Sequence, residues 1–290
     1  MSEAESGELP PSSVDPPGSE VAPAPQLARQ AIVVTLGVYL GYLLLSLLPL
    51  PGDLRYLLLV GAFYFLPGWL LRREPARQAR YQVGPDRVVP PWSWRGARVA
   101  AVSALLVFPP FVLLFFWFYS RVCAGDLSML APVTWVEGIV PGVGGLEDYL
   151  HRLCRPHEGG MWPQALRWPA DWLEHGGLGF VLAVAVEVFA VALPEEVFHR
   201  GYLMSALEER WPPRRRVLGV PLGLGAVLAS LVFAVGHLVG MAEVARLATF
   251  FPALVFSWLW RRSGSLWAPA LFHAAANLLM AVLIASTFPT

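Results

Sequence analysis

The chain has 290 residues and a formal net charge of zero; 56% of its residues are hydrophobic and only 14% are charged. Soluble domains carry about 25% charged residues and fewer apolar ones, and a mean hydropathy of +0.54 is too high for a soluble globule of this length. The composition excludes a cytosolic enzyme, a nucleic-acid-binding protein and a disordered scaffold. It predicts an integral membrane protein whose environment is the lipid bilayer.

Residues 1–30 are acidic and rich in proline, and they contain no apolar run. Such a segment cannot bury enough apolar surface to fold, so we expect a disordered tail. It also lacks the basic and apolar regions of a signal peptide.

Seven apolar stretches follow the tail, and most are long enough to cross a hydrocarbon core about 30 Å thick. Backbone groups find no water in lipid, so continuous apolar runs of this kind must be helices. The predicted fold class is all-α, a polytopic membrane helix bundle of about seven transmembrane helices. Three spans occupy 31–119 and four occupy 178–290; the stretches lie near 31–49, 54–71, 97–119, 178–206, 217–239, 243–260 and 265–288.

Arginine is the basic residue throughout the chain, and it concentrates in three connections: 72–98, 207–216 and the pair Arg261 and Arg262. With seven spans, all three connections fall on the same side of the membrane. The positive-inside rule makes that side the cytoplasm, which places the N-terminus inside.

The long connection 120–177 then lies outside. Its tryptophans favour a partly ordered cap at the membrane interface; they are Trp135, Trp162, Trp168 and Trp172. Cys123 and Cys154 also lie here, and the sequence leaves open whether they form a disulfide in an oxidising compartment or remain buried thiols.

Ionisable groups inside apolar spans are expensive and therefore functional candidates. In the fourth span, Glu196 and Arg200 are four residues apart and face each other on a helix. Glu195 points about 100° away, is not neutralised by the same arginine, and could act as a general base. The alternative is an ordinary salt bridge at a helix end. Pro194, just before the pair, weakens the helix there.

Two later spans carry the other polar groups. His237 ends the segment Phe233–His237, and His273 and Asn277 share one face of the last span across three alanines. Alone, His237 is compatible with a packed histidine, and the His273–Asn277 pair with a polar contact between helices. Together with Glu195 they are the parts needed to hydrolyse an amide by activated water: Glu195 and His237 hold the water, while His273 and Asn277 stabilise the oxyanion. Glu196 and Arg200 position Glu195.

This set, in this order, resembles the CPBP family of intramembrane proteases, which includes the CAAX prenyl endopeptidases. The resemblance covers roughly residues 178–288 and implies a glutamate-type endopeptidase that needs no metal and no cofactor. It implies the same roles for Glu195, His237, His273 and Asn277. The substrate would be a membrane protein or a lipid-modified peptide, cleaved near its C-terminal tail. The location expected is a bacterial inner membrane, and a myxosortase-like member acting on exported proteins is one possibility.

Several alternatives remain open from the sequence. Glu195, His237 and His273 could in principle bind zinc, although there is no HExxH motif. The polar groups could serve a non-catalytic immunity or partner protein, or a proton-coupled transporter. Glu187, eight residues before Glu195, either lines the cavity of the site or lies at the outer interface, and the second interpretation is favoured; His199 is interpreted as a packed side chain. Counting about 1.5 Å per residue from the arginine clusters puts the site in the middle or outer half of the core.

Overall fold

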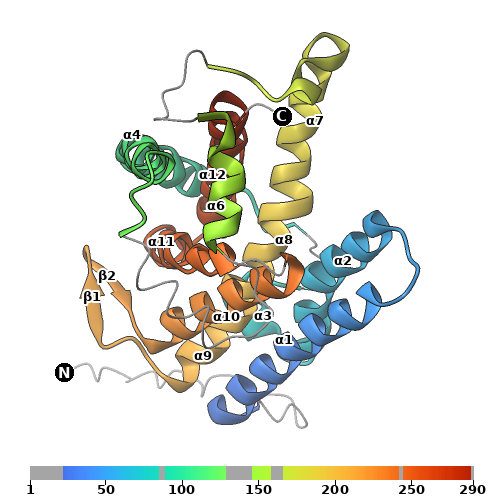
Figure 1. Cartoon of the computed structure of the whole chain (residues 1–290). Helices are drawn as coiled ribbons and strands as arrows, with labels where there is room; N and C mark the ends of the chain where they lie inside the picture. Colours follow the sequence, from blue (N-terminus) through green and yellow to red (C-terminus); the bar gives the residue numbers. More distant parts are fainter. Residues whose placement is uncertain (1–21, 85–88, 129–145, 158–165, 242–243, 289–290) are drawn as a thin grey trace, which may run out of the picture.

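Figure 1 shows the computed structural model, which describes residues 22–84, 89–128, 146–157, 166–241 and 244–288. The first half of the chain is helical: α1 (Ala24–Ser46), α2 (Gly52–Leu70), α3 (Pro75–Tyr81), α4 (Trp94–Cys123) and α6 (Leu146–Cys154). Two short 3₁₀ segments follow, η2 (Arg155–His157) and η3 (Ala170–Gly177).

The second half begins with one long helix, Leu178–Arg210. It consists of α7 (Leu178–Val186), η4 (Glu187–Ala192), α8 (Leu193–Glu196), η5 (Val197–Met204) and α9 (Ser205–Arg210), and both η4 and η5 are π-helical. A hairpin of β1 (Arg215–Val217) and β2 (Val220–Leu222) follows, then α10 (Leu224–Met241), η6 (Val244–Thr249), α11 (Phe250–Ser263) and α12 (Trp267–Thr287).

Four helices of the described chain are long and apolar enough to cross a membrane: Ala24–Ser46, Trp94–Cys123, Leu178–Arg210 and Trp267–Thr287. On α4, leucines such as Leu105 and Leu113 are more than 70% exposed, as lipid-facing side chains are. The prediction of an all-α membrane bundle is confirmed. Each of the seven predicted stretches contains a helix, but the count of seven spans stays a prediction, because α2, α10 and α11 are not among these four helices.

Two predicted boundaries differ from the structure. The predicted span 217–239 starts inside the hairpin, where Leu218 and Gly219 have φ values of +49° and +78° and reverse the chain. The apolar run alone did not reveal this turn. Helix α1 begins at Ala24, within the segment expected to be a disordered tail; residues 1–21 of that tail lie outside the described residues.

The core lies around the second half of the long helix. Every residue from Val197 to Glu208 is buried, whereas α7 has no buried residue. Gly201 allows one close contact in this core, since a Cβ there would lie 2.9 Å from the carbonyl oxygen of Tyr81. The long helix is thus surrounded by protein at one end and open to lipid at the other.

The arginine-rich connections meet at the buried end of the long helix. Glu209 accepts hydrogen bonds from Arg77 Nη2 at 2.8 Å, from Arg80 Nη2 at 2.5 Å and from the Tyr81 hydroxyl at 2.7 Å. Burial and the bond to Glu209 raise the pKa of Tyr81 well above its ordinary value, so that it remains a donor.

The third arginine cluster joins the same end. Arg261 forms an ion pair with Glu208, and Arg95 donates to the carbonyl of Arg262 at 3.2 Å. The prediction that the three connections share one side is therefore confirmed for the bundle. That this side is cytoplasmic stays a prediction.

The described parts of the connection 120–177 pack at the other end of the bundle, beside the C-terminus of α12 and the N-terminus of α7 (Figure 1). His157 Nε2 donates to the carbonyl of Thr287 at 2.5 Å, and the amide of Arg167 donates to Ser286 Oγ at 2.8 Å. Trp168 and Trp172 pack against Phe180 of α7 with ring centroids 5.8 and 5.4 Å away. Trp135 and Trp162 lie outside the described residues.

Of the two states the sequence left open for the cysteines, the structure shows the disulfide. Cys123 ends α4 and Cys154 ends α6, and the bond between them closes a chain separation of 31 residues. It fixes α6 to the end of the lipid-facing helix α4.

The disulfide predicts a measurable loss of stability on reduction. Replacing both cysteines with serine should lower the free energy of unfolding by about 2–4 kcal/mol, because the unfolded chain regains the freedom of the closed loop. Thermal unfolding of the double variant measures this, and reduced wild-type protein should behave alike. Quantitative labelling of both thiols in unreduced native protein would contradict the bond.

Candidate active site

The two glutamates lie in the middle of the long helix, in the α-helical turn Leu193–Glu196. A π-helical segment precedes this turn and another follows it, at Glu187–Ala192 and Val197–Met204. Single-turn π segments occur frequently at functional sites, since they redirect side chains relative to a regular helix.

Pro194 leaves a carbonyl without its helical donor, and α2 supplies a replacement. Proline has no N–H to donate; its acceptor would be Ala190 in α-helical bonding, or Phe189 in the five-residue bonding of the preceding π segment, where the Leu193 N–H donates to Val188. The hydroxyl of Tyr56 donates to the Ala190 carbonyl at 2.8 Å, and that of Tyr64 to the Phe189 carbonyl at 2.7 Å. In lipid no water could take this role, so α2 stabilises the helix where the glutamates begin.

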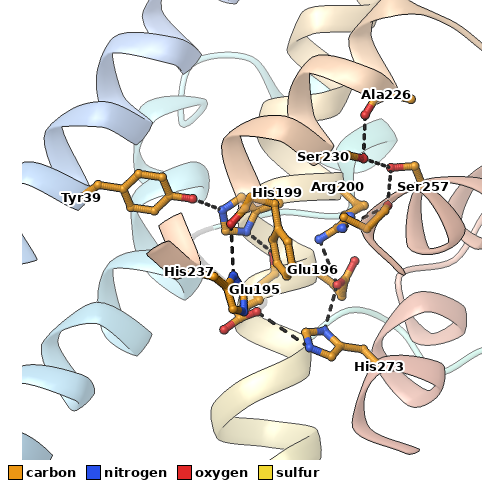
Figure 2. A network of polar contacts seen from close by, with 12 residues as sticks. Tyr39, Glu195, Glu196, His199, Arg200, Ala226, Ser230, His237, Ser257 and His273 are labelled. Atoms are coloured by element: carbon orange, nitrogen blue, oxygen red, sulfur yellow. Dashed lines mark hydrogen bonds and ion pairs between the residues drawn. The ribbon is translucent and has the colours of Figure 1, made fainter. Parts of the chain in front are cut away.

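Glu196 forms a buried ion pair and is fully enclosed. Its Oε1 accepts from Arg200 Nη1 at 3.0 Å and from His273 Nδ1 at 3.1 Å, and the side chains of Glu196 and Arg200 are 0% and 1% exposed (Figure 2). The guanidinium also lies over Phe233, 4.4 Å from the ring centroid, and donates to the carbonyl of Ala253. The predicted Glu196–Arg200 pair is confirmed, and it is shared with the last helix.

Glu195 is held differently. Its side chain is 17% exposed, and its Oε2 lies 3.9 Å from His273 Nε2 with no hydrogen-bond partner among the described residues. A water molecule roughly 2.8 Å from both atoms fits this separation. As predicted, Arg200 does not neutralise Glu195 by direct contact, and the carboxylate remains available for chemistry.

Three histidines and Arg200 surround the ring of Phe233. Its centroid lies 4.4 Å from that of His237, 5.0 Å from His199 and 6.0 Å from His273. His237 Nδ1 donates to the Phe233 carbonyl at 3.1 Å, so in the neutral ring Nε2 keeps a lone pair. His237 thus belongs to the cluster (Figure 2), although its contact is with Phe233 rather than directly with Glu195.

His199 and Tyr39 form a chain that the sequence did not reveal. His199 Nδ1 lies 2.8 Å from the carbonyl oxygen of Glu195, and Nε2 lies 2.7 Å from the Tyr39 hydroxyl. The carbonyl only accepts, so Nδ1 carries the proton, and in the neutral ring Tyr39 donates to Nε2. Gly236 faces the Tyr39 ring too closely to leave room for a Cβ. Helix α1 therefore reaches the backbone of Glu195 through His199.

Asn277 is one turn beyond His273 but faces another carboxylate. Its Nδ2 donates to Glu187 Oε2 at 2.9 Å. The carboxylate of Glu187 is turned toward α12, which supports the interpretation that it lines the cavity of the site; its depth in the membrane stays a prediction. The spacing of eight residues from Glu195 was the available signal, and it placed Glu187 near the same helix face.

Glu196 thus contacts Arg200 and His273, and Glu195 lies next to His273. His237 packs beside them against the ring of Phe233. Asn277 is hydrogen-bonded instead to Glu187, which lies on the same long helix as the two glutamates. Sequence reasoning missed Tyr39 and its bond to His199, because a single tyrosine in an apolar helix carries no spacing signal.

The zinc alternative needs three converging ligands. Within the described ranges, no group of three or more histidine, cysteine, aspartate and glutamate side chains is arranged to hold a metal ion.

Comparison with protein families gives one match: residues 177–279 match the model described as type II CAAX prenyl endopeptidase Rce1-like. The matched segment contains the long helix, α10, α11 and α12 as far as Asn277 and its neighbours. The helices α1, α2 and α4 lie outside it. Comparisons with curated proteins and with solved structures each give no match.

Replacing Glu196 tests the buried ion pair. Glu196→Ala leaves the guanidinium of Arg200 uncompensated in an apolar core, and we expect the free energy of unfolding to fall by about 3–5 kcal/mol. Unfolding in mixed detergent micelles measures it, with the exposed Glu174→Ala as control. A double variant, Glu196→Leu with Arg200→Met, should lose less than the single one; equal loss in Glu174→Ala would contradict the assignment.

Replacing Tyr39 tests the chain to His199. Tyr39→Phe removes the donor to a buried nitrogen, so the same unfolding measurement should show a loss of about 1–3 kcal/mol. Tyr42 lies in the same helix, and its hydroxyl has no hydrogen bond to a described residue. Tyr42→Phe is the matched control and should change little; similar losses in both variants would argue against the hydrogen bond.

Proposed function

We propose that the protein is an intramembrane endopeptidase in which Glu195 activates the attacking water, because residues 177–279 match the family model of type II CAAX prenyl endopeptidases. The observation that carries this proposal is the contrast between the two adjacent glutamates. Glu196 is bonded through its Oε1 to Arg200 and His273, whereas no described side chain is hydrogen-bonded to the Glu195 carboxylate, whose Oε2 lies 3.9 Å from His273 Nε2.

In the proposed reaction a water molecule binds between Glu195 and the imidazoles of the cluster. Glu195 takes one proton from it as the oxygen bonds to the carbonyl carbon of the scissile peptide. The carbonyl electron pair moves to its oxygen and forms a tetrahedral oxyanion. When the C–N bond breaks, the proton on Glu195 passes to the leaving amine, and the products are a carboxylic acid and an amine.

His237 offers its Nε2 lone pair as a second acceptor for the water, because its Nδ1–H is already bonded to the Phe233 carbonyl. His273 and Asn277 would supply donors to the oxyanion, an interaction whose loss costs about 3–4 kcal/mol per donor in other hydrolases. For His273 this requires a proton on both ring nitrogens, because its Nδ1–H is already bonded to Glu196. For Asn277 this requires its amide to exchange Glu187 for the substrate oxygen.

The proposed substrate is a membrane-associated or exported protein cleaved near its C-terminal tail. A site in the middle of lipid-embedded helices suits a peptide bond delivered beside a hydrophobic helix or a lipid-modified tail. The proposed location is a bacterial inner membrane.

Conversion of Glu195 to glutamine tests the proposal. Glu195→Gln keeps the size of the side chain but removes the base, and we expect cleavage to slow by 10²–10⁴-fold, roughly the contribution of a general base. Mass spectrometry of membrane-protein C-termini from cells with wild-type or variant protein identifies the products that disappear.

Glu174→Gln, which alters an exposed glutamate of η3, is the control and should leave the C-termini unchanged. Identical C-termini in wild-type and Glu195→Gln cells, at equal protein levels, would refute the endopeptidase. A biological role that persists in the variant would instead indicate a non-catalytic partner protein.

A further inference from the structure

A separate cavity of about 1130 Å³ lies at the arginine-rich end of the bundle, between α4, the β1–β2 hairpin, α10 and α11. Its walls are mainly apolar and include Leu106, Leu222, Val227, Leu254 and Trp258. None of its lining residues belongs to the cluster around Glu195. The cavity is large enough for a ligand well above the size of a metabolite.

Three arginines line this apolar cavity: Arg210, Arg214 and Arg215. In the described part of the chain, none of them forms an ion pair with a carboxylate. The nearby acidic side chains are already engaged by other arginines, since Glu209 binds Arg77 and Arg80.

Glu208 is also already paired with another arginine, because it forms an ion pair with Arg261. The cavity therefore combines apolar walls with an uncompensated positive rim. Such a combination fits an amphiphile whose polar group is an anion.

The β1–β2 hairpin brings exposed apolar and charged side chains together at this rim, as in protein segments that lie at a membrane interface. Its tip carries Leu218, which is 83% exposed, directly after the arginines of β1. The hairpin is fixed to α11, because Trp258 Nε1 donates to the Val217 carbonyl at 3.1 Å. An exposed leucine next to exposed arginines is stable where acyl chains meet phosphates.

We propose that this cavity binds an anionic phospholipid. Its acyl chain lies along the walls formed by α4, α10 and α11, and its phosphate is bound by Arg210, Arg214 and Arg215. A lipid with a net negative charge is favoured over a zwitterionic one, because three unpaired guanidinium groups face the headgroup. The predicted cytoplasmic location of this end agrees, since basic pockets there recognise anionic headgroups.

Native mass spectrometry of the full chain in detergent, with added phosphatidylglycerol or phosphatidylcholine, tests the site. We expect one phosphatidylglycerol to remain bound at concentrations where phosphatidylcholine is lost. The double variant Arg214→Gln, Arg215→Gln should weaken phosphatidylglycerol binding at least tenfold. Val227→Trp, which fills the apolar part, should weaken it without any change of charge.

The control variant is Arg72→Gln, Arg73→Gln, which removes two exposed arginines of the same end that do not line the cavity. It should bind phosphatidylglycerol as wild type does. Equal loss in this control would overturn the proposal in favour of general charge attraction.

Equal binding of the two lipids would also overturn the proposal. So would displacement of the lipid by millimolar inorganic phosphate, which would indicate a plain anion site. Displacement by a farnesylated peptide, with binding of that peptide abolished by Val227→Trp, would assign the cavity to substrate instead.

Discussion

The site depends on one buried unit of charge, in which Glu196 neutralises Arg200 and accepts a further bond from His273. In a low-dielectric interior neither charge is stable alone. The guanidinium is also enclosed by the faces of Phe233 and Phe256. Because Arg200 is fully engaged in this way, it does not pair with the neighbouring Glu195. The arrangement that pairs Glu196 with Arg200 therefore leaves the Oε2 of Glu195 without a hydrogen-bond partner among the described residues.

Spacing rules predicted the parts of this unit that lie within one helix. Four residues separate Glu196 from Arg200, and four also separate His273 from Asn277, so each pair falls on one helix face. What spacing could not predict is the partner each side chain takes across helices. His273 bonds to Glu196 and Asn277 to Glu187, because α12 packs against the long helix in a particular register. That register is a property of tertiary packing.

The supporting residues were out of reach for a different reason. Tyr56 and Tyr64 bind backbone carbonyls that are free because Pro194 and the π-helical segment interrupt the regular bonding. The sequence shows that Pro194 lacks a backbone donor, but it reveals neither the π-helical segment beside it nor that the replacement donors come from α2. Similarly, the turn at Leu218 and Gly219 is hidden in an apolar run. Local departures from regular structure, rather than composition, account for these omissions.

The contacts between the polar side chains lead from the site toward one end of the bundle. From Glu196 the contacts pass to His273, then one turn along α12 to Asn277, and across to Glu187 of the long helix. Both α12 beyond Asn277 and the long helix before Glu187 run toward the end closed by the disulfide and the connection 120–177. In the opposite direction every residue from Val197 to Glu208 is buried. The polar contacts of the site therefore extend toward the disulfide end and not toward the buried half of the long helix. The disulfide end is the one that the arginine distribution predicts to lie outside the cell.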